Sequence, residues 1–305
     1  MGERDFLSID DLAADELEGL LDDADAAKEK PARFSRRLAG KHVALIFEKP
    51  STRTRVSLEV AVTSMGGHAI VLRGDELQLG RGETIEDTGR VLSRYVDALV
   101  VRTFEQERLE RLAAGATVPV INALTDLSHP CQCLADLQTI RASKGSLRDV
   151  ALAYVGDGNN VAHSLLLGGA KMAMDVRVAS PSGFEPSSSV VERSRAIAAE
   201  SGGKVSVSNV VAEAASGAEV LYTDVWASMG QESESEQRAE AFERFKLDSD
   251  VVALADDDVI VMHCLPAHRG EEISADVMDG ARSVVWDQAE NRLHTQKALL
   301  ARLLS

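Results

Sequence analysis

The residues with the clearest chemical character stand together in one short segment, Ser51-Thr52-Arg53-Thr54-Arg55. Its three hydroxyl groups can donate hydrogen bonds, and its two guanidinium groups match the geometry of phosphate oxygens. A helix cap alone needs only one hydroxyl or carboxylate. The glycines and the lysine of a P-loop are missing here. The segment therefore predicts a phosphate-binding loop of another kind.

The neighbouring residues predict the elements that position this loop. Val43 to Phe47 are continuously apolar, which is typical of a buried strand. Val56 and Val60 lie four residues apart, as on one face of a helix, and Ala69 to Leu72 form the next apolar run. A strand, loop, helix and strand of this total length predict a βαβ unit. Its loop meets the helix N-terminus, where free N–H groups favour an anion.

Other chemically active side chains also follow predicted strands. They are Arg102 and His129 in the first half, and Asn159, Asn160, Asp224, His263 and Cys264 in the second. Ligands of parallel α/β sheets bind beyond the carboxyl ends of strands. We therefore expect two rows of residues facing a cleft, with an arginine-rich phosphate side and a side rich in amide, carboxylate and thiol groups.

The rest of the chain alternates in the same way. Strands are predicted at 98–101, 118–121, 150–155, 176–179, 204–207, 220–222, 259–262 and 283–286, and helices at 8–30, 85–95, 105–114, 131–143, 235–245 and 289–304. This alternation predicts an α/β fold with two domains, each a parallel sheet flanked by helices. The first domain would end at 145, near Gly145, and the second would run from 146 to 288.

Length and charge limit the possible functions. The chain has 305 residues, which suggests two domains, and no apolar run long enough to span a membrane. A formal charge of −16 argues against nucleic-acid and anionic-membrane partners. Abundant carboxylates with few lysines predict a salt-rich, halophilic cytoplasm, where salt screens the repulsion. The polar N-terminus and three cysteines also favour a reducing, cytoplasmic location.

Four ordered motifs together resemble one known family. Ser51 to Arg55 and His129-Pro130-Cys131-Gln132 are similar to the signature of carbamoyltransferases. Asp224 to Gly230 and His263-Cys264-Leu265-Pro266 resemble the ornithine branch of the aspartate/ornithine carbamoyltransferases. The resemblance continues to Asp287–Arg292 and so covers nearly the whole chain.

The resemblance implies carbamoyl transfer from carbamoyl phosphate to L-ornithine, giving L-citrulline and phosphate in arginine metabolism, with carbamoyl phosphate binding first. It implies a homotrimer, or a multiple of trimers, and a C-terminal helix, 289–305, that returns to the first domain. The carbamoyl phosphate site would comprise Ser51, Thr52, Arg53, Thr54, Gln78, Arg102, His129, Gln132, Cys264, Leu265 and Arg292. Ornithine would be held by Asn160, Asp224, Ser228 and Met229. Arg53, Arg102, His129 and Cys264 would be catalytic, and the Leu265–Pro266 bond would be cis.

Several alternatives remain open at this stage. A nicotinamide dehydrogenase would share the fold, but Val161 replaces the third glycine of its fingerprint. The amine acceptor could instead be putrescine, an N-acylated ornithine or aspartate, and a non-catalytic binding protein is a further alternative. His263 and Cys264 have no second pair at zinc-finger spacing, so we expect no metal site and no cofactor.

Overall fold

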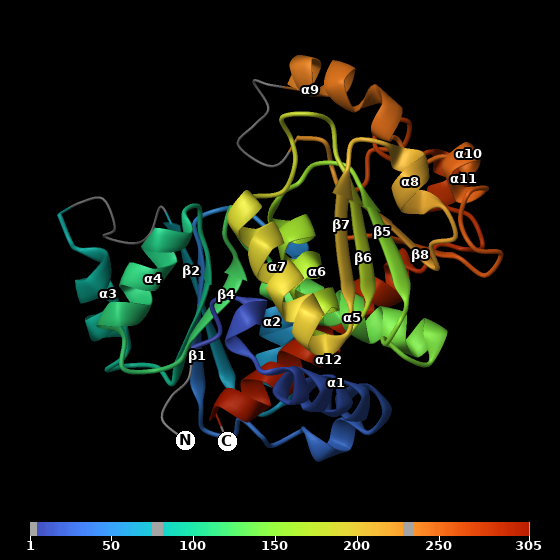
Figure 1. Ribbon diagram of the computed structural model, residues 1–305. Coiled ribbons are helices and arrows are strands. Elements are labelled where there is room, and N and C mark those ends of the chain that lie inside the picture. The colour runs from blue at the N-terminus through green and yellow to red at the C-terminus, as the bar shows by residue number, and fades with distance from the viewer. Residues whose placement is uncertain (1–4, 75–81, 228–234, 305) are drawn as a thin grey trace. The chain divides into compact units, whose positions relative to one another are not determined.

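The structure is a computed structural model that describes residues 5–74, 82–227 and 235–304. Two compact units divide the chain: Met1–Ala135 with Glu290–Ser305, and Asp136–Ala289. Each unit contains one parallel sheet flanked by helices, which confirms the predicted α/β fold class (Figure 1). The chain passes from one unit to the other inside two helices, α5 (Pro130–Lys144) and α12 (Val285–Leu304). The functional boundary after residue 145 stays a prediction.

The sheet of the first unit has four parallel strands in the order β2-β1-β3-β4. These are β1 (His42–Phe47), β2 (His68–Arg73), β3 (Ala98–Arg102) and β4 (Val120–Leu124). The helices are α1 (Ala14–Glu29), α2 (Thr52–Ser64), α3 (Ile85–Leu92) and α4 (Gln106–Gly115). Strands β3 and β4 are buried along their whole length, because helices cover both faces of the sheet.

Strand register decides which residues meet at the carboxyl edge of this sheet. Phe47, the last residue of β1, is the partner of Arg102 at the end of β3. The next backbone N–H, of Glu48, donates to the Arg102 carbonyl at 2.9 Å. The predicted phosphate loop therefore begins beside Arg102, although about 50 residues separate the two in sequence.

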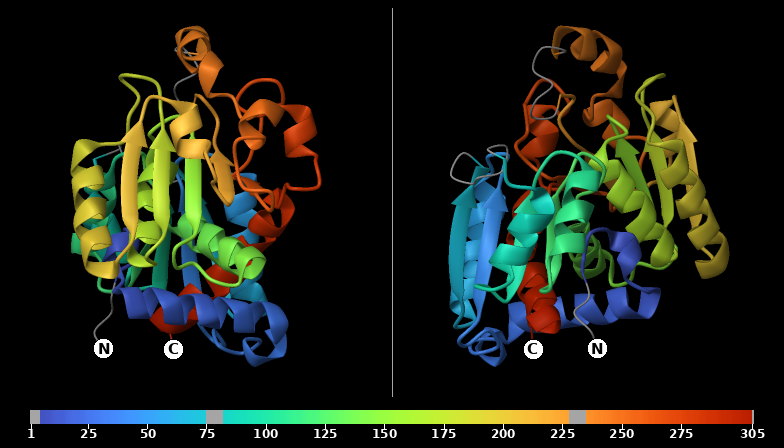
Figure 2. Two further views of the ribbon diagram at one scale, coloured as in Figure 1. Left: turned by 45° about the vertical axis from the view of Figure 1, so that its right-hand side comes forward. Right: turned by 90° about the vertical axis from the view of Figure 1, so that its left-hand side faces the viewer.

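The last helix packs against the first helix within this unit, as Figures 1 and 2 show. Lys28 Nζ donates to Asn291 Oδ1 at 2.9 Å, and Arg302 Nε donates to Asp23 Oδ2 at 2.5 Å. A Cβ atom added at Gly19 would lie 2.9 Å from the Arg302 guanidinium, so glycine allows this close approach. These contacts confirm that the C-terminal helix returns to the first unit.

The second unit has five parallel strands in the order β7-β6-β5-β8-β9. These are β5 (Ala151–Val155), β6 (Asp175–Ala179), β7 (Lys204–Ser208), β8 (Val220–Thr223) and β9 (Ile260–His263). The helices are α6 (Asn160–Lys171), α7 (Ser188–Ser201), α8 (Val211–Ala215), α9 (Ser235–Phe242), α10 (Ser249–Val252) and α11 (Ala275–Met278). Strand order places the carboxyl ends of β5, β8 and β9 next to each other.

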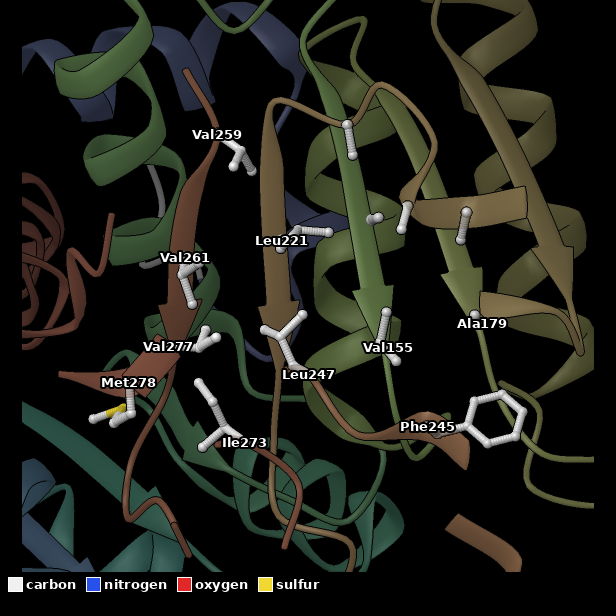
Figure 3. Packing of buried hydrophobic residues seen from close by; sticks show 14 of the residues in the cluster. Val155, Ala179, Leu221, Phe245, Leu247, Val259, Val261, Ile273, Val277 and Met278 are labelled. Carbon is white, nitrogen blue, oxygen red and sulfur yellow. The ribbon is translucent and has the colours of Figure 1, made fainter. Parts of the chain in front are cut away.

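One apolar core covers a face of this second sheet (Figure 3). Val155, Leu221 and Val261 point from three strands into the core, and Ile273 and Met278 pack on them from the segment after β9. Residues in alternate positions, such as Tyr154 and Tyr222, are fully buried on the other face. The two tyrosine rings stack with centroids 5.8 Å apart. Burial on both faces explains the uninterrupted apolar runs that predicted these strands.

The structure corrects some predicted elements. The strand expected at 283–286 is wrong: Ser283 makes only an isolated bridge with Val261, and α12 already begins at Val285. The opening helix is two elements, a 3-10 turn at Ile9–Asp11 and α1, because the backbone is extended at Leu12 and Ala13 between them. No helix in the described parts of the chain has the length and apolar character needed to cross a bilayer.

Candidate active site

Paired charges anchor the loop that follows β1. The Glu48 carboxylate accepts hydrogen bonds from Arg108 Nε at 3.0 Å and from Arg108 Nη2 at 2.8 Å. Lys49 Nζ forms an ion pair with Asp126 and lies 4.5 Å from the centroid of the Phe104 ring. Glu48 and Lys49 are thereby held in position at the start of the loop, so the hydroxyl and arginine residues that follow begin from a fixed backbone.

Ser51 begins helix α2 as its N-cap, in an extended conformation with its hydroxyl accepting from Thr54 N at 3.3 Å. Thr52 is exposed, Arg53 is half-buried, and Thr54 is buried with 1 % exposure. The first turn of α2 contains no acidic residue. The positive end of the helix and the hydroxyl groups can therefore receive an anion with no carboxylate on that turn to oppose it.

A buried arginine joins this loop to the second motif of the unit. Arg292 Nη1 donates to Gln132 Oε1 at 2.7 Å, and Arg292 Nη2 donates to Thr54 Oγ1 at 2.9 Å. The three side chains come from α12, α5 and α2, and each is at most 3 % exposed. Gln132 lies 160 positions before Arg292 in the sequence, and Thr54 lies 238 positions before it. Arg292 thus connects these distant residues and places a charged guanidinium at the N-terminus of α2.

His129 lies within the electrostatic influence of two arginines. Burial lowers the pKa of His129 well below its ordinary value, and the positive charges of Arg292 and Arg102 lower it further. The imidazole is therefore neutral at neutral pH and can donate one N–H to a ligand. Arg102 itself is 8 % exposed at the end of β3. The structure brings Thr54, Arg102, His129, Gln132 and Arg292 into one buried cluster.

In the second unit, Asp224 joins the carboxyl ends of three adjacent strands. Its Oδ2 accepts from Asn159 Nδ2 at 2.8 Å, after β5. Its Oδ1 accepts from Cys264 Sγ at 2.9 Å, after β9, and from the N–H of Val225 at 2.8 Å. A carboxylate offers about four acceptor positions, so three donors leave room for one more, such as a substrate ammonium.

Asn159, the first residue of the Asn-Asn pair, contacts Asp224. Asn160 is the first residue of α6, and its predicted role toward ornithine stays a prediction. Asn159 also caps that helix, because its Oδ1 accepts from the N–H of Val161 at 2.9 Å. The Asn-Asn pair after a strand was a visible signal, but spacing could not tell which residue caps the helix and turns toward Asp224.

The structure adds a buried network that the sequence did not indicate. Tyr222 OH donates to Asp136 Oδ2 at 3.2 Å, and Gln288 Nε2 donates to Asp136 Oδ1 at 2.7 Å. Gln288 Oε1 accepts from the backbone N–H of His263 at 3.0 Å, next to Cys264. Burial raises the pKa of Tyr222 well above its ordinary value, and the Asp136 charge adds to this rise. These hydrogen bonds hold the backbone at the carboxyl end of β9 in position.

Three of the predicted site residues, Gln78, Ser228 and Met229, lie outside the described residues. Cys264 and Leu265 follow β9, and Leu265 has a positive φ of 62°. The Leu265–Pro266 bond is cis, which confirms that expectation. Cys264 belongs to the second unit, so its predicted role toward carbamoyl phosphate stays a prediction.

The first α/β unit has a buried arginine cluster at a helix N-terminus, and the second has a carboxylate at adjacent strand ends. This combination is typical of α/β proteins that bind small anionic and amino ligands. Residues 4–142 match the family model described as "Aspartate/ornithine carbamoyltransferase, carbamoyl-P binding domain". Residues 148–303 match "Aspartate/ornithine carbamoyltransferase, Asp/Orn binding domain". The chain belongs to the aspartate/ornithine carbamoyltransferase family.

Individual relatives are similar to this chain over its full length. The chain is 62% identical to the ornithine carbamoyltransferase of Parafrankia sp., covering 100% of this chain and 97% of the relative. It is 58% identical to that of Acidothermus cellulolyticus, covering 99% and 96%. The solved structure of ornithine carbamoyltransferase from Pyrococcus furiosus superposes with a TM-score of 0.96 at 53% identity, over 99% of this chain and 97% of that one.

Proposed function

We propose that this protein is an ornithine carbamoyltransferase, which transfers the carbamoyl group of carbamoyl phosphate to L-ornithine and releases L-citrulline and phosphate in arginine metabolism. The single observation that carries the choice of acceptor is the Asp224 carboxylate, held between Asn159 and Cys264 with an acceptor position to spare. A carboxylate suits a substrate ammonium, whereas the second carboxylate of aspartate would be repelled.

In this proposal the first unit binds carbamoyl phosphate, which enters first. Its ligands are Ser51, Thr52, Arg53, Thr54, Gln78, Arg102, His129, Gln132 and Arg292, joined by Cys264 and Leu265 of the second unit. The buried contacts of Arg292 with Thr54 and Gln132 support this assignment. Neutral His129 donates its N–H to the carbonyl oxygen, while the arginines bind the phosphate.

The second unit binds ornithine through Asn160, Asp224, Ser228 and Met229, with Cys264 beside the reacting amine. The δ-ammonium has a pKa near 10.4, like that of lysine, and must lose its proton before it attacks. Asp224, already holding the Cys264 thiol, orients this group and favours its approach. The ammonium proton passes to the Asp224 carboxylate, and the free amine nitrogen bonds to the carbonyl carbon. The carbon–oxygen bond to phosphate then breaks, and phosphate leaves with the electron pair and takes up the second proton that the nitrogen releases.

Domain roles and surroundings belong to the same proposal. Residues 1–145, with helix 289–305, form the carbamoyl phosphate-binding domain, and 146–288 form the ornithine-binding domain. The protein works as a homotrimer, or a multiple of trimers, in the cytoplasm, without nucleic-acid or membrane partners. A formal charge of −16 supports a halophilic setting, because molar salt screens the repulsion between carboxylates.

The test compares acceptors in one assay. Citrulline formation from carbamoyl phosphate and ornithine is measured beside carbamoylation of putrescine, N-acetylornithine and aspartate, at low and high KCl. We expect ornithine to give the highest kcat/KM. A higher value for aspartate, putrescine or the acylated amine would assign the protein to another branch of the family, and no turnover with any acceptor would reject the enzyme.

A further inference from the structure

The backbone that follows β9 bends sharply at Leu265, the residue after Cys264. Leu265 has a φ of 62°, in the left-handed region that residues with a Cβ atom rarely adopt. A residue other than glycine keeps this conformation only where the surrounding structure holds it. The contacts of the Leu265 backbone therefore determine where the neighbouring thiol lies.

A side chain two residues earlier holds this backbone. The Leu265 N–H donates to His263 Nδ1 at 2.8 Å. Because a backbone N–H can only donate, Nδ1 carries no proton and the ring proton lies on Nε2. Nε2 in turn donates to Glu272 Oε1 at 3.2 Å. His263 therefore links a backbone donor to a carboxylate acceptor, and Glu272 selects the tautomer that makes this link possible.

This chain of hydrogen bonds is buried and fixed at both ends. His263 is 1 % exposed and Glu272 is 0 % exposed. Glu272 Oε1 also accepts from the backbone N–H of His268, which keeps the carboxylate in place. The backbone N–H of His263 donates to Gln288 Oε1 at 3.0 Å. Hydrogen bonds thus hold the backbone on both sides of Cys264, where little water competes with them.

The thiol held in this way meets the carboxylate that follows β8. Cys264 Sγ donates to Asp224 Oδ1 at 2.9 Å, so a shift of the backbone would move the thiol off its acceptor. We propose that His263 and Glu272 are positioning residues for the proposed carbamoyl transfer. They act through the backbone beside the thiol: His263 supplies the acceptor, and Glu272 keeps Nδ1 free of a proton. The kinetic part of this inference rests on the proposed function, whereas the hydrogen bond of Leu265 is measured without turnover.

Two substitutions at His263 separate the roles of its two ring nitrogens. Asparagine places its amide oxygen near the position of Nδ1 and accepts from an N–H two residues on, so His263→Asn keeps the bond to Leu265. Glutamine reaches the position of Nε2 instead, so His263→Gln keeps a donor to Glu272 and loses the acceptor for Leu265. The control is His268→Gln, because that half-exposed imidazole lies 3.6 Å from Glu272 Oε2, too far for a hydrogen bond.

Hydrogen exchange of the Leu265 amide tests the positioning directly, with the amide of buried Leu221 as the reference for global unfolding. Relative to that reference, exchange at Leu265 should be at least about tenfold faster in His263→Gln and nearly unchanged in His263→Asn and His268→Gln. NMR of the unmodified protein should show the His263 proton on Nε2. A proton on Nδ1, or equal exchange in the two His263 variants, would overturn the proposal.

Citrulline synthesis measures the effect of this hydrogen bond on the reaction. His263→Gln should lower kcat about 100-fold and change the ornithine KM less than about threefold, because misplacement by about 1 Å has an effect of this size. His263→Asn should keep kcat within about fivefold, although both variants lose one buried contact and have a lower Tm. Equal kcat in the two variants, or a kcat that follows Tm in both, would contradict a positioning role.

A second pair of variants keeps the test available if the His263 variants do not fold. Glu272→Gln retains an oxygen that accepts the Nε2 proton, whereas Glu272→Met does not, so only Glu272→Met lets the proton move to Nδ1 and break the bond to Leu265. Exchange at Leu265 should therefore rise in Glu272→Met alone, and equal exchange in both would overturn the proposal. Absence of citrulline synthesis by the unmodified protein would reject the proposed function, while the exchange result still decides the positioning.

Discussion

Replacement of Arg292 by methionine tests the buried cluster of the first unit most directly. The change removes the donor shared by Gln132 and Thr54 and one of the two positive charges near His129. Each hydrogen bond to a charged group contributes about 1.5–3 kcal/mol, so the two together give about 3–6 kcal/mol of unfolding free energy. This is an upper bound, because the methionine variant avoids the desolvation cost of burying a charged guanidinium.

Two measurements follow from this variant. A loss of 3 kcal/mol corresponds to a fall in Tm of about 6–12 °C for a unit of this size. If Arg292 also donates to the developing charge on phosphate, kcat/KM for carbamoyl phosphate should fall about 100- to 1000-fold, as for loss of one oxyanion donor. Steady-state kinetics at saturating ornithine and thermal unfolding give both numbers.

The pH dependence of kcat/KM tests the same arrangement independently, because the direction of its shift can be predicted. Arg292 lowers the pKa of His129 by repelling the imidazolium, so removing that charge makes protonation easier and raises the pKa. The acidic limb of kcat/KM should therefore move to higher pH in Arg292→Met. Titration of the His129 ring by NMR follows the same change without turnover.

The matched control is Arg302→Met, about three turns further along α12. Arg302 pairs with Asp23, and their side chains are 38% and 43% exposed, so at most about 1 kcal/mol is expected. Its kinetics and pH profile should not change. An Arg292→Met protein that folds, binds carbamoyl phosphate normally and keeps the original pH profile would refute the placement of the phosphate site.

Three further predictions concern other parts of the chain. Asp224→Asn should raise the ornithine KM at least tenfold and leave the carbamoyl phosphate KM nearly unchanged; a selective effect on carbamoyl phosphate would contradict this role. Tyr222→Phe leaves Asp136 without one buried donor, so chemical denaturation should show a loss of about 1–3 kcal/mol, and an unchanged midpoint would argue against the network. Thermal unfolding in dilute buffer and molar KCl should show a higher Tm in KCl, since salt screens a net charge of −16; an equal or lower Tm would reject halophilic adaptation.

Local sequence patterns were sufficient for most of the fold. Apolar patterns predicted all nine strands of the described residues. Central strands such as β3 and β5 are continuously apolar because they are covered on both faces, whereas β6 and β7 alternate between apolar and polar residues. The run at 283–286 misled for the same reason: Val284 and Val285 are apolar, but Val285 is buried as the first residue of α12. A short apolar run cannot distinguish a strand from the start of a buried helix.

The sequence by itself determined the reactive groups and their order along the strands, since residue type and local spacing encode loops, caps and strand ends. Only the tertiary structure decided which distant groups meet. Arg292 reaches Thr54 across 238 positions, Asn159 donates to Asp224 from another strand end, and Gln288 joins Asp136 to the end of β9. Such contacts depend on strand order and helix packing, which bring residues together without leaving a periodic signal in the sequence.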